Sequence, residues 1–455
     1  MVTISAELLW QDVGVYEQLH RKTAATLCAL ERACGQRATD SAREFLDNCS
    51  LLTGAASPPQ VLTASSALAW CHRAYDLERA ARSGEVDAER LLSAHLHSFK
   101  LFAAGAALLL GADQRFATPL LLDRPVIVPG TQLRLSGPAT LALHGVGDGA
   151  LLVSTGEAER PWRLSRETAI EGVALRSLPV ARHRGAAIML GPEVFDLPGV
   201  EPADARSVVP VDPFYQERCA PMVELALAAI ERHDPVVFAQ MKLALCAVGV
   251  KPRAAGDFQG ISFSDFPGAF IISYIAHPYL IAESMVHEFH HNRLFAIESA
   301  VPLVEDTGAE TALYYSPFRP DPRPIRGLLH GLYVFAAVWR FWDKVRHTAD
   351  LEPVLHAFAV DRTFRIAFQL ASACKQLAIH PGLTTNGQAV FAILAREAED
   401  IVTAVDRSGH GMDSPAAFCS EDGVMRIEVD ETTGATLTVA DALRLQRHRF
   451  IDALQ

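Results

Sequence analysis

The sequence predicts a mainly helical α+β protein, and three observations lead to that prediction. Apolar residues recur every three or four positions over long stretches toward both ends of the chain, which is the spacing of amphipathic helices. Between these stretches, short β-branched or leucine-rich runs alternate with glycines, as expected for strands joined by turns. Half of the 455 residues are hydrophobic, so the chain can bury more than one core.

Four regions follow from these patterns. Residues 1–115 are expected to form a helical N-terminal region, and residues 116–210 a β-rich region with an antiparallel sheet. Residues 211–410 are expected to form a helical, metal-binding catalytic region. Residues 411–455 carry a hairpin signal near 425–439, followed by the pattern of a last helix.

The catalytic region divides further. Its pattern predicts one long helix, two short strands and four later helices, in this order: a helix over 214–248, strands over 260–264 and 269–274, and helices over 279–300, 325–345, 351–380 and 386–406. The metal motif described below lies on the first of the four later helices.

Charge and targeting signals exclude several classes of protein. The formal net charge of −12 argues against nucleic-acid binding, because phosphate neutralisation requires a basic face. The N-terminus lacks a basic segment followed by an apolar one, and the most apolar stretch, 101–110, is about half of a membrane span. The apolar stretch is therefore too short for a membrane partner to be expected. The eight cysteines are scattered without a Cys-x-x-Cys pair, which favours a reducing, cytoplasmic location.

The motif His287-Glu288-Phe289-His290-His291 predicts a mononuclear metal site. Two histidines four residues apart on a helix project about 40° apart on one face, so both rings can reach a single ion. Glu288 stands beside that face, where it could handle a proton on metal-bound water. His290 is expected to be a spare residue, either behind the ligands or at the surface.

The third ligand is not fixed by the motif itself. Glutamates after the motif are candidates, namely Glu298, Glu305 and Glu310. His330 is the better candidate because it lies on the next confident helix between Gly327 and Gly331. Each of these glycines costs roughly 1 kcal/mol of helix stability, which is easier to explain if the backbone must approach another group closely.

A proline-stiffened loop precedes the His330 helix and displays Arg319, Arg323 and Arg326 within a short stretch. Arginine binds carboxylates through two parallel N–H groups, so one of these side chains could hold a carboxylate-bearing co-substrate near the metal. The other interpretation is a rigid connector whose arginines form structural ion pairs.

Taken together, three segments resemble the HExxH-motif family of peptide-modification proteins, which accompany the biosynthesis of ribosomally made peptides. The segments are His287-Glu288-x-x-His291, Tyr315-Ser316-Pro317-Phe318-Arg319-x-Asp321-Pro322-Arg323-Pro324 and Gly327-Leu328-Leu329-His330-Gly331. The resemblance covers about 255–345 well and is weaker elsewhere. It implies an iron(II)- and 2-oxoglutarate-dependent peptide β-hydroxylase that consumes O2.

The resemblance also implies roles for particular residues. His287, His291 and His330 would bind iron, with Glu288 or Glu298 remaining possible as a carboxylate ligand. Arg323 would pair with a carboxylate of 2-oxoglutarate, and Arg319 and Arg326 are the alternatives for this role.

The implied partner is a precursor peptide, which the non-catalytic regions could grip through a leader segment. The strand-like segment before the metal helix could offer its edge to an extended peptide, with Ser262 and Tyr274 lining the site.

Two other functions stay open. A zinc-dependent peptidase would use Glu288 as general base and a later glutamate as ligand. A non-catalytic binding protein would use the histidine motif structurally. The arginine loop and His330 favour the oxygenase over the peptidase, since a peptidase needs no keto-acid clamp.

Overall fold

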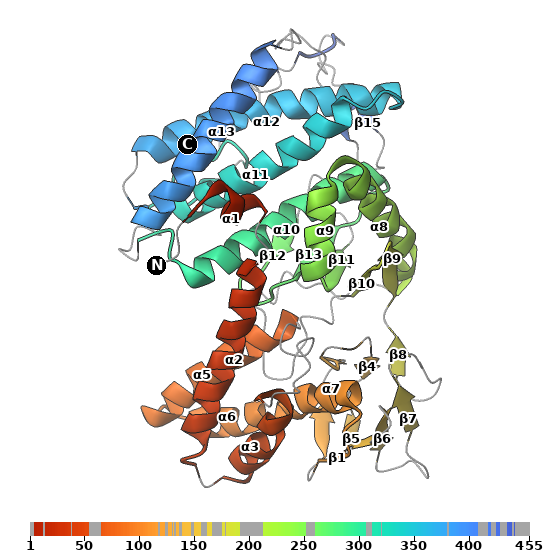
Figure 1. Cartoon of the computed structure of the whole chain (residues 1–455), viewed down its shortest axis with the longest axis vertical. Helices are drawn as coiled ribbons and strands as arrows, with labels where there is room; N and C mark the ends of the chain where they lie inside the picture. Colours follow the sequence, from red (N-terminus) through yellow and green to blue (C-terminus); the bar gives the residue numbers. More distant parts are fainter. Residues whose placement is uncertain are drawn as a thin grey trace.

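The structure is a computed structural model. It describes residues 4–11, 14–37, 39–53, 65–116, 119–122, 126–129, 131, 133–135, 139–146, 150–155, 162–165, 175–177, 179–191, 213–251, 260–305, 312–319, 321–379, 382–407, 417–419, 425–427, 435–438 and 441. The molecule is elongated, with the N-terminal helices at one end, the last helices at the other, and the motif helix between them (Figure 1).

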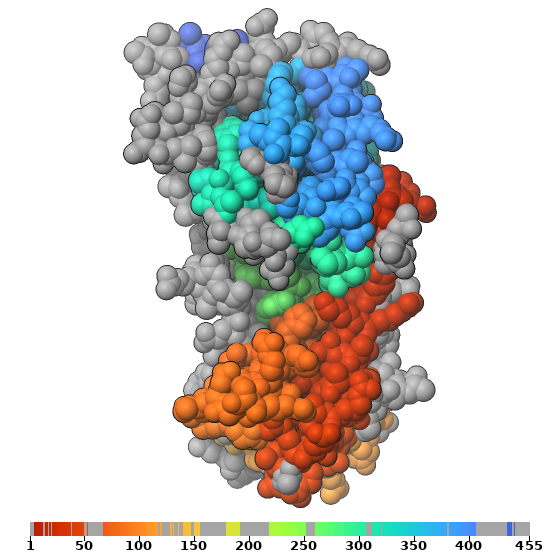
Figure 2. All heavy atoms as spheres, turned by 90° about the vertical axis from the view of Figure 1, so that its left-hand side faces the viewer, coloured from red at the N-terminus to blue at the C-terminus, as the bar shows by residue number. Residues whose placement is uncertain are grey.

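The N-terminal region is mainly helical in its described residues. Its described helices are α1 (Ala6–Trp10), α2 (Gly14–Cys34), α3 (Asp40–Thr53), α5 (Ser65–Arg82), α6 (Ala88–Ser98) and α7 (Lys100–Leu110). Gly111 ends α7 in the left-handed conformation at φ 66°, which glycine adopts without steric cost. Apart from α1, which lies against the motif helix, these helices occupy the lower part of the face seen in Figure 2.

The strands before residue 178 form antiparallel sheets, whereas Ala186–Leu190, which also lies in the expected β-rich region, pairs in parallel with a later strand. The antiparallel strands are β1 (Gln114–Arg115), β2 (Leu120–Leu122), β3 (Val126–Ile127), β4 (Leu133–Leu135), β5 (Ala139–Val146), β6 (Ala150–Thr155), β7 (Trp162–Ser165) and β8 (Leu175–Ser177). One sheet runs in the order β1-β5-β6-β7, with β2 also paired to β5, and a second in the order β3-β4-β8. Helix α7 packs on β5 and β6 and closes a small apolar core.

A mixed sheet positions the motif helix. Its order is β12-β13-β11-β10-β9, from β9 (Val180–His183), β10 (Ala186–Leu190), β11 (Ala247–Lys251), β12 (Ile261–Ser262) and β13 (Ala269–Ser273). Strands β10, β11 and β13 are parallel, while β9 and β12 are antiparallel edge strands. The expected strands before the motif are confirmed, and two strands from before residue 210 complete their sheet.

Strand β13 is buried on both faces of the sheet. Its successive side chains point to opposite faces, so they enter two different cores. Phe270 and Ile272 of β13 face the main core, which also contains the motif helix. Ala269 and Ile271 of the same strand face the core of the N-terminal helices. This double burial explains the continuous apolar run of β13 and places β12 next to the motif helix.

The single long helix expected over 214–248 is wrong. The chain instead forms α8 (Pro213–His233) and α9 (Pro235–Ala244), followed by β11. Pro235 lacks a backbone N–H and starts a new helix, and the side chain of Asp234 caps that helix by accepting from the N–H of Val237. The apolar run after Leu245 then extends as a strand, since it pairs on both sides within the sheet.

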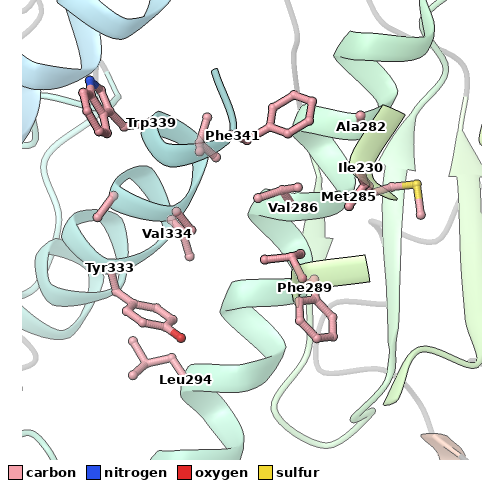
Figure 3. Packing of buried hydrophobic residues seen from close by; sticks show 14 of the residues in the cluster. Ile230, Ala282, Met285, Val286, Phe289, Leu294, Tyr333, Val334, Trp339 and Phe341 are labelled. Carbon is pink, nitrogen blue, oxygen red and sulfur yellow. The ribbon is translucent and has the colours of Figure 1, made fainter. Parts of the chain in front are cut away.

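The later helices lie close to their expected bounds. They are α10 (Pro278–Ala300), α11 (Ile325–Arg346), α12 (Pro353–Ile379) and α13 (Thr385–Arg407). The apolar side of α10 carries Val286 and Phe289, which lie in the same buried cluster as Val334 and Phe341 of α11 (Figure 3). The histidine pair of α10 also faces α11, where His287 contacts the Phe335 ring and His291 contacts the His330 ring.

Helix α1 is pinned against the two helices that carry the histidines. The guanidinium of Arg293 on α10 donates to the carbonyl oxygens of Leu8 and Leu9 at 2.8 and 2.9 Å. The ring of Trp10 stacks on Tyr333 of α11 at 4.6 Å, and the Arg340 guanidinium lies 3.7 Å from the Trp10 ring. Helix α1 therefore braces α10 and α11.

The C-terminal region differs in part from its expected layout. Strands β14 (Ala417–Cys419) and β15 (Met425–Ile427) pair antiparallel, so the start of the expected 425–439 range pairs with an earlier segment. Residues 428–434 and 439 of that range lie outside the described residues. The helix expected over 441–453 lies outside the described residues, apart from Asp441. Within the described parts of the chain, none of the helices is both long enough and apolar enough to cross a bilayer.

Candidate metal centre

Helix α10 brings the two motif histidines together. Nε2 of His287 and Nε2 of His291 lie 3.2 Å apart. Two nitrogens that bind one ion at about 2.1 Å are separated by roughly 3.0 Å at a right angle and by roughly 3.4 Å at the tetrahedral angle. The observed separation falls between these values, so the pair is spaced as two ligands of a single ion.

The environment keeps both rings neutral, which is the form whose lone pair can bind a metal. The pKa of His287 is lowered to about 3, mainly by burial and to a smaller extent by the charges of Arg362 and Arg319. Burial also lowers the pKa of His291 well below its usual value, with the neighbouring histidines acting in the same direction.

Glu288 lies beside the histidine pair in a buried position. Its Oε1 is 3.9 Å from Nε2 of His287, and its Oε2 accepts a hydrogen bond of 2.6 Å from the hydroxyl of Ser262. Burial raises the pKa of Glu288 to about 8, although the Ser262 hydroxyl opposes this. Gly260 allows the arrangement, since a Cβ at this position would overlap the Glu288 carboxyl group.

His330 approaches the pair from α11, but at the other nitrogen of His291. Nδ1 of His330 lies 3.2 Å from Nδ1 of His291, whereas Nε2 of His291 faces His287. On its far side, Nε2 of His330 lies 3.2 Å from Oε2 of Glu298, at ion-pair distance but off the direction of a straight hydrogen bond.

As the side chains are placed, no group of three His, Cys, Asp or Glu residues in the described structure converges on one point that could hold an ion. The donors therefore fit a metal as a two-nitrogen pair. The third ligand remains a prediction among His330, Glu288 and Glu298.

The remaining glutamate candidates do not join this cluster through a described contact. Glu305 lies beyond the end of α10, where its backbone N–H donates to the carbonyl of Gly382. Glu310 lies outside the described residues. His290 is a core residue rather than a surface one: its Nδ1 lies 2.7 Å from the Val286 carbonyl, and its ring packs near Trp10.

The three loop arginines have different surroundings. Arg326 pairs with Glu298 at 2.6 Å, which makes it part of a structural ion pair. Arg323 and Arg319 both form ion pairs with Asp321 at 3.0 Å. Of these two arginines, Arg319 is the one whose charge shifts the pKa values of the motif residues. Its charge lowers the pKa values of His287, Glu288 and His291. Arg319 is thus the loop arginine whose charge reaches the histidine pair.

Two further cations near the motif were not predicted from the sequence. Arg362 of α12 pairs with Glu283, one turn before His287, and lies 5.8 Å from the Phe335 ring. Lys251 ends β11 and lowers the pKa of Glu288 through its charge. No local pattern marks either residue, because one sits in an ordinary amphipathic helix and the other at the end of an unpredicted strand.

The two residues predicted to line a peptide site lie in different places. Ser262 contacts Glu288 directly, donating to its backbone carbonyl at 3.0 Å as well as to its carboxylate. Tyr274 follows β13, where its backbone N–H donates to the Lys251 carbonyl and its side chain packs against the main core. Ser262 is therefore part of the motif's immediate surroundings.

A separate surface cleft of about 480 Å³ lies between α2, α5 and the turn after β12. His72 and Asp265 approach each other within it at 3.2 Å, and Lys22 and Asp76 lie on its walls. None of the residues predicted for the site lines this cleft.

Comparison with known proteins gives no assignment. None of the protein-family models matches the sequence. No curated protein matches it either.

Proposed function

We propose that the chain is an iron(II)- and 2-oxoglutarate-dependent oxygenase that hydroxylates a side-chain β-carbon of a ribosomally made precursor peptide. The observation that carries this proposal is the metal-like spacing of the His287 and His291 nitrogens, with the charges of Arg362 and Arg319 acting on His287. The resemblance of the motif, the arginine loop and the His330 segment to the HExxH-motif peptide-modification family supports the same reaction.

The cations near the motif suit an anionic co-substrate. Arg319 and Arg362 act on His287, and Lys251 and Arg319 act on Glu288. A positive potential of this kind concentrates a dicarboxylate such as 2-oxoglutarate near the pair. Before reaction a peptide bond carries no charge for this potential to attract, whereas 2-oxoglutarate carries two, so these charges favour the oxygenase.

The protein's own residues would have three tasks in this reaction. His287 and His291 hold the ion, and Arg319 binds a carboxylate of the keto acid through its guanidinium fork. Glu288, held by Ser262, orients polar groups next to the ion. When bound, iron with 2-oxoglutarate and O2 supplies the oxidation that converts C–H to C–OH while the keto acid becomes succinate and CO2.

The edge strand β12 offers a place for the peptide. It pairs on one side with β13, and Ser262 on this strand contacts Glu288. An extended peptide that adds to a sheet edge is held by main-chain hydrogen bonds, which leaves its side chains to determine specificity. The regions before residue 210 could grip a leader segment of the same precursor.

The test is anaerobic reconstitution with iron(II), followed by addition of 2-oxoglutarate. We expect the visible charge-transfer band of a chelated keto acid, and we expect His291→Ala to abolish it. Arg319→Ala should raise the 2-oxoglutarate concentration that gives half of the band by at least about tenfold, since it removes a charge-assisted pair. A larger effect of Arg323→Ala than of Arg319→Ala would return the carboxylate to Arg323.

A zinc-dependent peptidase is the second candidate, and the position of Glu288 favours it. A carboxylate 3.9 Å from a motif nitrogen is close enough to act as general base on metal-bound water. Tight zinc binding, cleavage of a generic peptide that Glu288→Gln abolishes, and no keto-acid band would together establish this function. If no metal binds at all, the histidine motif is structural.

We further propose a cytoplasmic location. No disulfide joins the cysteines whose side chains are described, and several of these cysteines are buried in the cores. Thiols of this number without disulfides suit a reducing compartment.

A further inference from the structure

The contacts of His291 assign a task to two residues behind it. Its Nε2 faces His287 and its Nδ1 faces His330, each at 3.2 Å. The two nitrogens of an imidazole point away from each other. An ion held between His287 and His291 therefore lies on the opposite side of the His291 ring from His330.

The protonation pattern of these rings follows from the metal-binding form. If Nε2 of His291 gives its lone pair to an ion, the single proton of this neutral ring sits on Nδ1. Nδ1 of His330 then accepts that proton in a hydrogen bond, so His330 carries its own proton on Nε2. That nitrogen lies 3.2 Å from Oε2 of Glu298, which is an acceptor.

Glu298 is itself held in place. Its carboxylate accepts from Nε and Nη2 of Arg326 at 3.1 and 2.6 Å, and the side chains of Glu298 and His330 are only 8% and 6% exposed. The ring of Phe295 packs on His330 at 4.8 Å. The paired Arg326 guanidinium thus holds the Glu298 carboxylate beside Nε2 of His330.

We infer that His330 and Glu298 are positioning residues, which fix the ring orientation and tautomer of His291 so that its Nε2 faces the ion. The inference rests on the proposed metal site at His287 and His291. A carboxylate or imidazole that accepts from the second nitrogen of a metal-binding histidine raises its affinity, and its loss typically costs about 10- to 100-fold in metal binding. His330 then belongs behind a ligand instead of among the ligands.

The experiment counts the imidazoles bound to Cu2+ by pulsed EPR and measures Zn2+ affinity by competition with a chelator. The variants are H330Q, H330L and E298Q, together with H287A. The matched control is H347Q, since His347 is an exposed histidine that follows the last residue of the His330 helix as its C-cap. Thermal unfolding of each metal-free variant shows whether it folds.

We expect the wild type, H330Q and H347Q to show the same imidazole count, and H287A to show one fewer. Zn2+ affinity should fall by about 10- to 100-fold in H330L and E298Q. It should fall less in H330Q, because the glutamine amide can both accept from His291 and donate to Glu298. If H330L does not fold, E298Q decides, because glutamine keeps the volume of the glutamate.

Two results would overturn the inference while leaving the metal site intact. Loss of one imidazole in H330Q would make His330 a ligand, and unchanged Zn2+ affinity in both E298Q and a folded H330L would remove any positioning role. By contrast, a wild type without bound imidazoles, or an H287A variant with unchanged Zn2+ affinity, would refute the metal site itself.

Discussion

Substitution of Gly331 by alanine tests how the packing of α11 controls the histidine pair. A Cβ at this position would lie 2.7 Å from Cδ2 and 3.0 Å from Cε2 of Phe318, where ordinary contacts are 3.4–4 Å. The Phe318 ring must therefore move by roughly 1 Å. It stacks on Phe335 at 4.5 Å, and Phe335 lies edge-on to His287 at 5.0 Å, so the displacement is directed at His287, one of the two proposed metal ligands.

Two opposing terms set the size of the effect on stability. Alanine improves helix propensity by about 1 kcal/mol. Forcing an extra methyl group into a packed site costs about 1–3 kcal/mol. We expect Gly331→Ala to lower the free energy of unfolding by about 0–2 kcal/mol. Zn2+ affinity should fall by roughly tenfold, since that fall needs only about 1.4 kcal/mol of strain at His287.

The assays are urea unfolding of the metal-free protein and Zn2+ competition. Gly327→Ala is the control on the same helix: its Cβ would lie 3.3 Å from Cβ of Arg323, so this neighbour must move by only a few tenths of an ångström. This control should stabilise the fold by up to about 1 kcal/mol. Phe318→Leu should relieve the effect of Gly331→Ala in a double variant. A Gly331→Ala protein that is more stable than the wild type and binds Zn2+ equally well would refute the reasoning.

Three further outcomes are expected. Trp10→Ala removes the buried ring stacked on Tyr333 and should lower the free energy of unfolding by about 3–5 kcal/mol in urea; a loss below about 1 kcal/mol would mean that α1 is not a brace. Gly260→Ala displaces the Glu288 carboxyl group and should lower turnover by about 100-fold with little change in Zn2+ affinity; normal turnover would exclude a role for that carboxyl group. Burial lowers the pKa of His95 from 6.5 to about 4, so the unfolded chain binds a proton in this range that the folded chain does not, and stability falls as the pH falls. His95→Gln should remove about 3 kcal/mol of this pH dependence between pH 7 and pH 4, measured by urea unfolding at each pH; an unchanged slope would contradict the assignment.

The sequence by itself determined the features that depend on local geometry. The helix repeat places residues four apart on one face, and the structure brings Nε2 of His287 and His291 together on a helix at the expected bounds. The two glycines around His330 also had a local meaning. Gly331 does face a close neighbour, the Phe318 ring, as its cost to the helix had indicated.

The tertiary structure alone decided which residues from distant segments meet at the pair. Arg362 lowers the pKa of His287 from α12, and Lys251 lowers that of Glu288 from the end of β11, a strand that the sequence did not predict and whose first two residues fell in the expected 214–248 helix. The nitrogen of His291 that faces His330 likewise depends on how α10 crosses α11. Periodicity records which face of an element is apolar, but the partner of that face is set by packing between elements far apart in the chain.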